Sequence, residues 1–279
     1  MSKQAASLII WLIAGSQRRV GRRQKVTCAM LISTDGIVLK TKPLGNDDHV
    51  YTILTREKGV ITAFARNRQK ISRGMGSALE LFTYSNFVLF QSKERYSVNS
   101  ATSNKVFFGI RSDIEKVSLA SYLSELLIEL APEEGENPNE YVRLFLNCLA
   151  MLESGKRTVQ FIKPLFELRL MALSGYMPDL LGCMVCGESE GKSLSFLPKE
   201  GSMVCCDCIG QVSGQLTVQL TPSELAAMRH IIYAPMEKLF SFALPEQALK
   251  RLSAITEQYI YYQLEKTFST LDFYHTLIP

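Results

Sequence analysis

The sequence is poor in the residues and patterns on which catalysis depends. Only three histidines occur among its 279 residues, His49, His230 and His275, and none lies in an HExxH-type metal-ligand pattern. Neither a phosphate-binding P-loop nor the G-x-G-x-x-G dinucleotide fingerprint is present. The adjacent carboxylates Asp47 and Asp48 fall in a turn-rich segment, where aspartate is common for structural reasons. The sequence therefore predicts a protein that is not an enzyme.

The sequence also lacks a hydrophobic run long enough to cross a bilayer. The apolar stretch at residues 5–14 is too short. Most of the nearby positive charge follows this stretch, whereas a secretory signal peptide carries its charge first. Residues 1–29 contain six lysines and arginines and no acidic residue, and they match nothing that follows. We predict that they form a disordered N-terminal extension, that the fold begins near Met30, and that the protein has no membrane partner.

The charge distribution indicates which part of the chain meets a polyanion. The net charge is +4, and 47% hydrophobic residues supply enough apolar mass for two or three small domains. Residues 1–29 contribute +6, residues 30–110 contribute +5 and residues 111–279 contribute −7. A basic N-terminal half joined to an acidic C-terminal half predicts a polyanionic partner for the first half only.

Residues 35–100 contain a series of short strands separated by turns. Apolar and β-branched residues occur in five stretches, and glycine, proline, asparagine and charged residues lie between them. The predicted strands are residues 36–41, 50–55, 60–65, 79–90 and 95–98. Five short strands in roughly 65 residues favour a small closed barrel such as the five-stranded OB-fold.

Beyond residue 104 the hydrophobic spacing changes to that of helices. Apolar residues recur every three or four positions, which places them on one face of a helix. Pro164 is expected in the first turn of its helix, and Thr221 with Glu224 has the spacing of an N-terminal capping box. The predicted helices cover residues 119–130, 144–152 and 164–173, a segment opening at Thr221, and residues 245–268.

These patterns predict an α+β multidomain protein. The predicted parts are an OB-fold β-barrel at 30–104, an all-α helical domain at 105–181, an inserted four-cysteine zinc-finger segment at 182–210, and C-terminal helices at 211–279 that pack on the helical domain.

The four-cysteine segment has the spacing of a structural zinc site. Cys183 and Cys186 form one C-x2-C pair, eighteen residues follow, and Cys205 and Cys208 form a second pair. Two residues between paired cysteines allow both thiolates to reach one ion at about 2.3 Å. Glycines flank the first pair, as a tight turn close to a metal requires. We predict one structural Zn²⁺ held by these four thiolates, which leave no open position for catalysis.

Two alternatives remain open for these cysteines. They could be reduced and unligated, or they could form a disulfide or a redox pair, although the sequence gives no sign of an oxidising compartment. Cys206 could replace Cys205 as a ligand, but only one residue would then separate it from Cys208, a spacing less suited to binding one ion. Cys28 and Cys148 lie far from the segment and are not expected to bind the metal.

The basic residues of the barrel are the candidate nucleic-acid contacts. Lysine and arginine bind phosphates without regard to base sequence, and OB-folds bind oligonucleotides through one sheet face and its loops. The candidates are Lys40, Lys42, Arg56, Lys58, Arg66, Arg68, Lys70 and Arg73. Among the aromatic residues, Tyr51, Phe64 and Tyr84 could stack on bases, although core packing is the favoured interpretation for them. The alternative for the cations is a solvated charged surface.

The combination of these features resembles the RecO family of DNA repair proteins. The similarity rests on residues 36–41 (Gly-Ile-Val-Leu-Lys-Thr), residues 54–59 (Leu-Thr-Arg-Glu-Lys-Gly), and residues 173–178 (Leu-Ser-Gly-Tyr-Met-Pro) followed by the two cysteine pairs. Residues 63–70 depart from the family pattern because they lack its usual glycine, and Glu200-Gly201 stands where the family has paired glycines.

The resemblance implies a recombination mediator that catalyses no bond chemistry. RecO-like proteins bind single- and double-stranded DNA, anneal complementary strands, and act with RecR to help RecA replace single-stranded-DNA-binding protein. It also implies a scaffolding role for the zinc and a cytoplasmic, nucleoid-associated location. The alternative from another class is a zinc-stabilised transcription regulator or adaptor protein without annealing activity.

Overall fold

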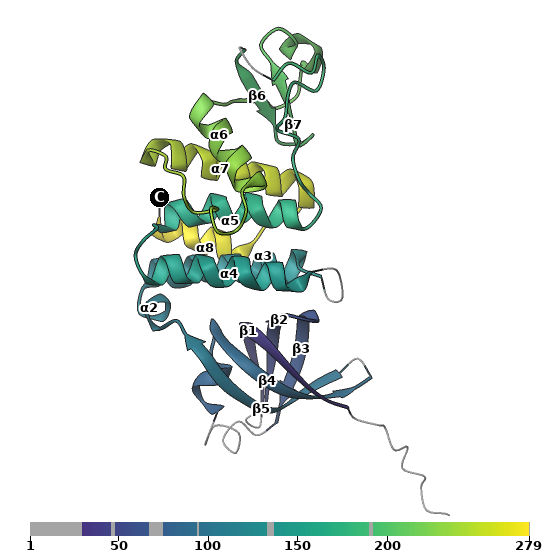
Figure 1. Ribbon diagram of the computed structural model, residues 1–279, viewed down its shortest axis with the longest axis vertical. Coiled ribbons are helices and arrows are strands. Elements are labelled where there is room, and N and C mark those ends of the chain that lie inside the picture. The colour runs from purple at the N-terminus through teal and green to yellow at the C-terminus, as the bar shows by residue number, and fades with distance from the viewer. Residues whose placement is uncertain are drawn as a thin grey trace, which may run out of the picture.

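The computed structural model describes residues 30–45, 48–66, 75–93, 95–132, 137–189 and 192–278. A β-barrel lies at one end of the molecule, stacked helices form the middle, and a small cysteine-bearing sheet lies at the other end (Figure 1). This arrangement confirms the predicted α+β fold class. The predicted N-terminal extension at residues 1–29 lies outside the described residues.

Five strands close into a barrel in the order β1-β2-β3-β5-β4. The strands are β1 (Met30–Gly45), β2 (Asp48–Thr55), β3 (Gly59–Ala65), β4 (Thr83–Ser92) and β5 (Arg95–Val106). β3 and β5 pair in parallel, and all other neighbours are antiparallel. Inward residues alternate with outward ones, most clearly in β3, where Ile61, Ala63 and Ala65 are buried. The predicted OB-type barrel is therefore confirmed.

Two strand boundaries differ from the predicted ones. The fourth strand begins at Thr83 and not at residue 79, because a 3-10 turn at Ser77–Leu79 precedes it and buries Ala78 and Leu79. The fifth strand continues to Val106, eight residues beyond the predicted end, and pairs with β4 along its length. Its polar and small residues carry no strong strand signal, and pairing with β4 determines their conformation.

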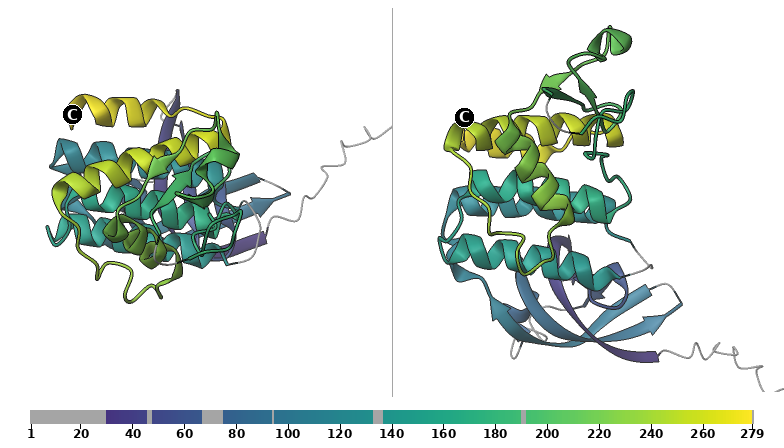
Figure 2. Two further views of the ribbon diagram at one scale, coloured as in Figure 1. Left: turned by 90° about the horizontal axis from the view of Figure 1, so that it is seen from above. Right: turned by 45° about the horizontal axis from the view of Figure 1, so that its top comes forward.

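Seven helices occur in the described part of the chain after the barrel. They are α2 (Phe108–Arg111), α3 (Ile114–Leu130), α4 (Pro138–Glu153), α5 (Val159–Leu173), α6 (Pro222–Tyr233), α7 (Glu246–Leu264) and α8 (Ser269–Leu277). Figure 2 shows α3, α4, α5 and α7 stacked between the barrel and the cysteine-bearing sheet. Among these helices, none combines the length and apolar character needed to cross a membrane.

Two helix predictions need correction and one is confirmed. Pro164 lies inside α5, which begins five residues earlier because the Thr158 side chain caps its N-terminus by accepting from Phe161 N. The predicted last helix at residues 245–268 ends earlier, at Leu264, because Glu265 adopts a left-handed conformation (φ 50°), and α8 follows as a further helix that was not predicted. The capping box between Thr221 and Glu224 is confirmed, with both reciprocal hydrogen bonds present.

A buried ion pair joins the helices. Lys163 of α5 is 1% exposed and Glu167, one turn later, is 0% exposed, with Nζ and Oε1 2.7 Å apart. Their other hydrogen-bond partners are Tyr122 of α3 and Ser253, Thr256 and Glu257 of α7, at 2.5–3.1 Å. Because every buried charge has several partners, the pair ties three helices together in one arrangement.

The cysteine-bearing segment contains a three-stranded sheet that the sequence analysis did not predict. Its strands are β6 (Leu194–Leu197), β7 (Ser202–Cys205) and β8 (Val218–Gln219), in the order β7-β6-β8. The ring of Phe196 in β6 packs edge-on against Tyr259 of α7 at 5.6 Å, and Tyr259 Oη donates to Tyr176 O at 2.8 Å. The sheet is therefore attached to the helical domain through α7.

Candidate zinc site and nucleic-acid interface

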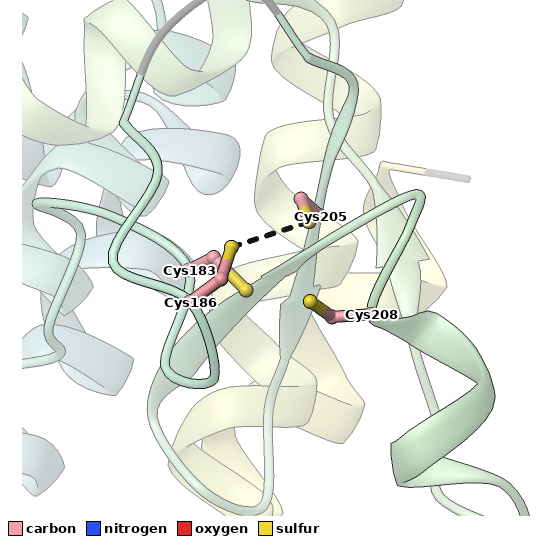
Figure 3. Close-up of side chains that lie close together, drawn as sticks. All are labelled: Cys183, Cys186, Cys205 and Cys208. Atoms are coloured by element: carbon pink, nitrogen blue, oxygen red, sulfur yellow. Dashed lines mark hydrogen bonds between the residues drawn. The ribbon is translucent and has the colours of Figure 1, made fainter.

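Four cysteine side chains converge in the small sheet. The sulfurs of Cys183, Cys186, Cys205 and Cys208 all lie within 4.8 Å of one another (Figure 3). The first two come from the loop after α5, Cys205 ends β7, and Cys208 immediately precedes a 3-10 turn at Ile209–Val212. The structure thus brings together the four cysteines that the spacing selected.

The backbone around the first pair is held in a tight loop. Gly187 N donates to Cys183 O and Cys183 N donates to Glu188 O, each at 2.8 Å. A side chain at Gly182 would place its Cβ 2.8 Å from Gly187 O, and Gly187 itself has a φ of +75°. Both glycines are therefore required by the loop, one for close approach and one for its left-handed conformation.

The geometry and electrostatics of the four thiols fit a zinc ion. A tetrahedral site with Zn–S bonds of 2.3 Å has S···S edges of about 3.8 Å, and the sulfurs of Cys186 and Cys205 are 3.8 Å apart. Burial acts to raise the pKa of Cys183, but backbone N–H groups of Cys186, Cys205 and Val185 outweigh it and lower this pKa to about 6.

The pKa of the fourth thiol, Cys208, is shifted in the opposite direction. Hydrogen bonding to Cys205, together with burial and the neighbouring thiols, raises the pKa of Cys208 to about 12. Crowded thiolates repel one another, so all four ionise together only around a cation. The donor set therefore could hold a soft metal ion, and all its positions would be filled by protein.

The remaining cysteines lie away from the cluster. Cys206 is exposed and its sulfur faces Asp207 Oδ1 at 3.6 Å. Cys148 is buried in α4, where burial raises the pKa of its thiol beyond the usual range. Cys28 lies outside the described residues. No disulfide occurs among the cysteines that the structure describes.

The outer face of three barrel strands carries several of the predicted DNA contacts. Lys40 of β1 pairs with Thr52 of β2, and Lys42 pairs with Val50, which in turn pairs with Phe64 of β3. Residues paired across adjacent strands project to the same side of the sheet. Lys40 and Lys42 are exposed, and they extend outward over this face.

The same end of the barrel holds two further cations. Arg66 follows β3, two positions beyond Phe64, and is exposed. Arg95 is the first residue of β5 and is exposed. It lies two positions before Ser97, which pairs with Phe64, and it was not among the predicted contacts. The alternation in the predicted fifth strand was the signal that could have identified Arg95. Three further candidates, Arg68, Lys70 and Arg73, lie outside the described residues.

Two predicted contacts lie at the opposite end of β3. Arg56 and Lys58 belong to the turn between β2 and β3, where Arg56 N donates to Asp35 O at 3.0 Å. The strand between this turn and Arg66 spans roughly 20 Å at 3.3 Å per residue. The turn also abuts the helical domain, since Val60 N donates to Pro132 O at 3.0 Å. The cations that are close in sequence are therefore divided between two ends of the barrel.

The cations of the barrel face differ from those of the helical domain in their pairing. Every ion pair between two described residues uses a lysine, arginine or histidine at position 105 or later. Lys40, Lys42, Arg66 and Arg95 make no such pair. Their positive charge is therefore not compensated by carboxylates within the described part of the chain.

Of the three candidate stacking residues, one reaches the surface. Tyr51 is 0% exposed and Tyr84 is 9% exposed, which confirms the core-packing interpretation for both. Phe64 is 36% exposed and lies on the outer face beside the lysines.

One segment matches a catalytic spacing. Residues 187–191 read Gly-Glu-Ser-Glu-Gly, the G-x-S-x-G pattern of a nucleophile elbow. Ser189 is exposed in the stretch that leads from the first cysteine pair to β6, with neither the preceding strand nor the following helix that an elbow requires. The spacing therefore carries no catalytic meaning here.

Comparison with known proteins assigns the chain to a family. The family model "Recombination protein O N terminal" matches residues 30–107, and "Recombination protein O C terminal" matches residues 111–272. The DNA repair protein RecO of Acetivibrio thermocellus is 31% identical over 246 residues, which cover 88% of this chain and 97% of that protein. The RecO protein of Alkaliphilus metalliredigens is 30% identical over 244 residues, covering 87% and 98%. The chain therefore belongs to the RecO family of DNA repair proteins, which are not enzymes.

Proposed function

We propose that this protein is a recombination mediator that binds single- and double-stranded DNA on the barrel face and anneals complementary strands. It acts with RecR and helps RecA replace single-stranded-DNA-binding protein. The observation that carries the proposal is the group of exposed cations Lys40 and Lys42 on β1 and Arg66 just after β3, which have no carboxylate partner within the described part of the chain. Family membership supports the DNA-repair context over the regulator or adaptor alternative.

Annealing requires no bond chemistry from the protein. Two single strands repel each other through their phosphates, and lysine and arginine contacts neutralise part of that charge and release condensed counterions. A surface that binds phosphates without reading bases can bring unrelated strands together, and base pairing then selects the complementary ones. Cations that are not already paired with carboxylates are the ones suited to this task.

The metal has a structural role in this proposal. Cys183, Cys186, Cys205 and Cys208 would hold one Zn²⁺, and their four thiolates would complete its coordination. These residues would then fix the loop after α5 against β7, which pairs with β6, the strand that packs on α7. The zinc thus stabilises the fold and takes no part in DNA contact.

The test compares two sets of charge-removing substitutions on the barrel. The first variant combines Lys40→Gln, Lys42→Gln and Arg66→Gln, and the matched control combines Arg56→Gln and Lys58→Gln at the other end of β3. The logarithm of the binding constant falls linearly with the logarithm of the salt concentration, and each lost phosphate contact reduces this salt slope by about 0.7 for single strands. We expect the first variant to flatten the slope by roughly 2 and to weaken binding of unrelated sequences about equally.

The control variant should change the salt slope by less, because Lys58 is half-buried and the Arg56 guanidinium lies 5.5 Å from the Tyr84 ring centroid. Annealing of complementary oligonucleotides should slow in parallel with the loss of binding. If the first variant folds, binds single strands with unchanged affinity and keeps the salt slope, DNA does not bind on this face.

A further inference from the structure

A single row of paired residues around the barrel wall carries two exposed phenyl rings. Phe90 of β4 pairs with Ser97 of β5, and Ser97 pairs with Phe64 of β3. Residues paired in this way project to the same side of the sheet. Phe90 is 43% exposed and Phe64 is 36% exposed. Two aromatic rings are thus exposed to solvent on the same wall, and β5, with the small side chain of Ser97, lies between them.

Cations border these rings on both sides. Arg95 lies two positions before Ser97 on the outward side of β5, and Arg66 lies two positions beyond Phe64. The same row continues from Phe64 through Val50 to Lys42. Two strand spacings place the Phe64 and Phe90 backbones about 10 Å apart. The rings therefore lie within a band of positive charge that could follow a polynucleotide backbone.

We propose that Phe64 and Phe90 bind the bases of single-stranded nucleic acid by stacking, while the neighbouring cations bind its phosphates. The proposal rests on the proposed function, since it assumes that the barrel face binds single strands. It adds the groups that hold the bases, and it makes β4 and β5 part of the interface together with the faces of β1, β2 and β3.

The chemistry of the row favours a nucleic acid as its occupant. Isolated exposed phenylalanines are common on protein surfaces. Here two of them share one row with Lys42 and are flanked by Arg66 and Arg95, cations that have no carboxylate partner among the described residues. Aromatic rings for bases and cations for phosphates are the two elements of sequence-independent single-strand binding.

Stacking also suits a protein that anneals strands. A phenyl ring contacts the face of a base and leaves its Watson–Crick edge accessible, so a bound strand can still pair with its complement. In a duplex the base faces already stack on one another, and the rings have nothing to bind. The site is therefore expected to distinguish single strands from duplexes, which phosphate contacts alone do much less strongly.

The experiment measures binding of the full chain to an oligothymidylate and to a duplex of equal length. The variants are Phe64→Ala and Phe90→Ala, and the matched control is Phe108→Ala, which removes a phenylalanine of α2 that is 68% exposed. Each barrel substitution should weaken oligothymidylate binding roughly 5- to 150-fold, the range reported for loss of one stacked base. The salt slope should stay unchanged, because no phosphate contact is removed, and duplex affinity should stay within about 2-fold.

Phe64→Trp and Phe90→Trp should retain single-strand affinity, and base stacking should quench the new indole fluorescence. If an alanine variant fails to fold, Phe64→Leu and Phe90→Leu keep the apolar side chain without the aromatic face and should show the same selective loss. Unchanged oligothymidylate binding in both folded variants would overturn the proposal and leave the proposed function intact. An equal loss for duplex and single strand would overturn it too. A wild-type protein that binds no single strand would instead refute the proposed function.

Discussion

Breaking the buried Lys163–Glu167 ion pair of α5 should destabilise the helical domain strongly. Lys163→Met keeps most of the length of the side chain but removes a charge whose three hydrogen bonds go to Glu167, Ser253 and Glu257. Glu167 is 0% exposed and would lose its cationic partner. Removing one partner of a buried pair costs about 3–5 kcal/mol, because the remaining charge is left without compensation.

That loss is a large fraction of the total stability of a domain, which is about 5–15 kcal/mol. For a domain of this size each kcal/mol lowers Tm by about 2–4 °C, so Tm of the helical transition should fall by roughly 6–20 °C. Far-UV circular dichroism during urea and thermal unfolding measures the change. The control is Lys250→Met, since the Lys250–Glu246 pair is exposed and should contribute about 0.5 kcal/mol or less.

The stability loss should also depend on pH. Burial raises the pKa of Glu167, and the charge of Lys163 acts against this shift, so its removal raises the pKa further. A carboxyl group whose pKa is higher in the folded than in the unfolded protein stabilises the fold at low pH. This stabilisation disappears as pH rises through the folded-state pKa. The difference between Lys163→Met and the wild type should therefore be smallest at acid pH and grow as pH rises above 4.5.

Adding Glu167→Gln to Lys163→Met removes the uncompensated charge while an amide still meets Tyr122 and Thr256. The double variant should recover most of the lost stability and lose the pH dependence. A loss of under about 1 kcal/mol for Lys163→Met at neutral pH, or a loss of stability that is the same at all pH values, would contradict this prediction.

The remaining predictions concern the metal and a helix end. Cys183→Ser should lose its zinc, measured as metal per chain, and should unfold at a lower temperature because metal binding contributes folding free energy. Cys206→Ser should keep one zinc per chain, and zinc loss in this variant alone would contradict the ligand assignment. Thr221→Ala removes one side of the capping box and should cost about 1 kcal/mol in urea unfolding, whereas an unchanged midpoint would show that Glu224 caps α6 by itself.

Local spacing made the four-cysteine cluster and the barrel predictable. Two cysteines in a C-x2-C pair are brought together by the turn between them, so their convergence depends little on distant contacts. The strand at residues 60–65 alternates bulky and small residues, and the alternation survives in the fold because one face of β3 lines the barrel interior. Both features are encoded within a few residues of the side chains concerned.

The features that the sequence analysis missed depend on contacts across the fold. The strand β6 is buried at all four positions, so it shows no alternation that could mark it as a strand. The helix α5 begins five residues before the predicted start at Pro164, because Thr158 carries the capping signal and the proline lies inside the helix. Likewise, Arg56 and Arg66 are near in sequence but separated by the length of β3, which the linear clustering of cations cannot reveal.

Among the described residues, the ladder between β3 and β5 is the shortest of the barrel. Two residue pairs are in register there, Ala63 with Tyr96 and Phe64 with Ser97, whereas β4 and β5 pair at ten positions. Local opening begins where backbone hydrogen bonds are fewest, so the amides along this junction should exchange with solvent sooner than those of β4. Single-stranded DNA bound to residues of both β3 and β5 would hold these two β-strands together from outside. DNA binding would then slow the local opening of the barrel.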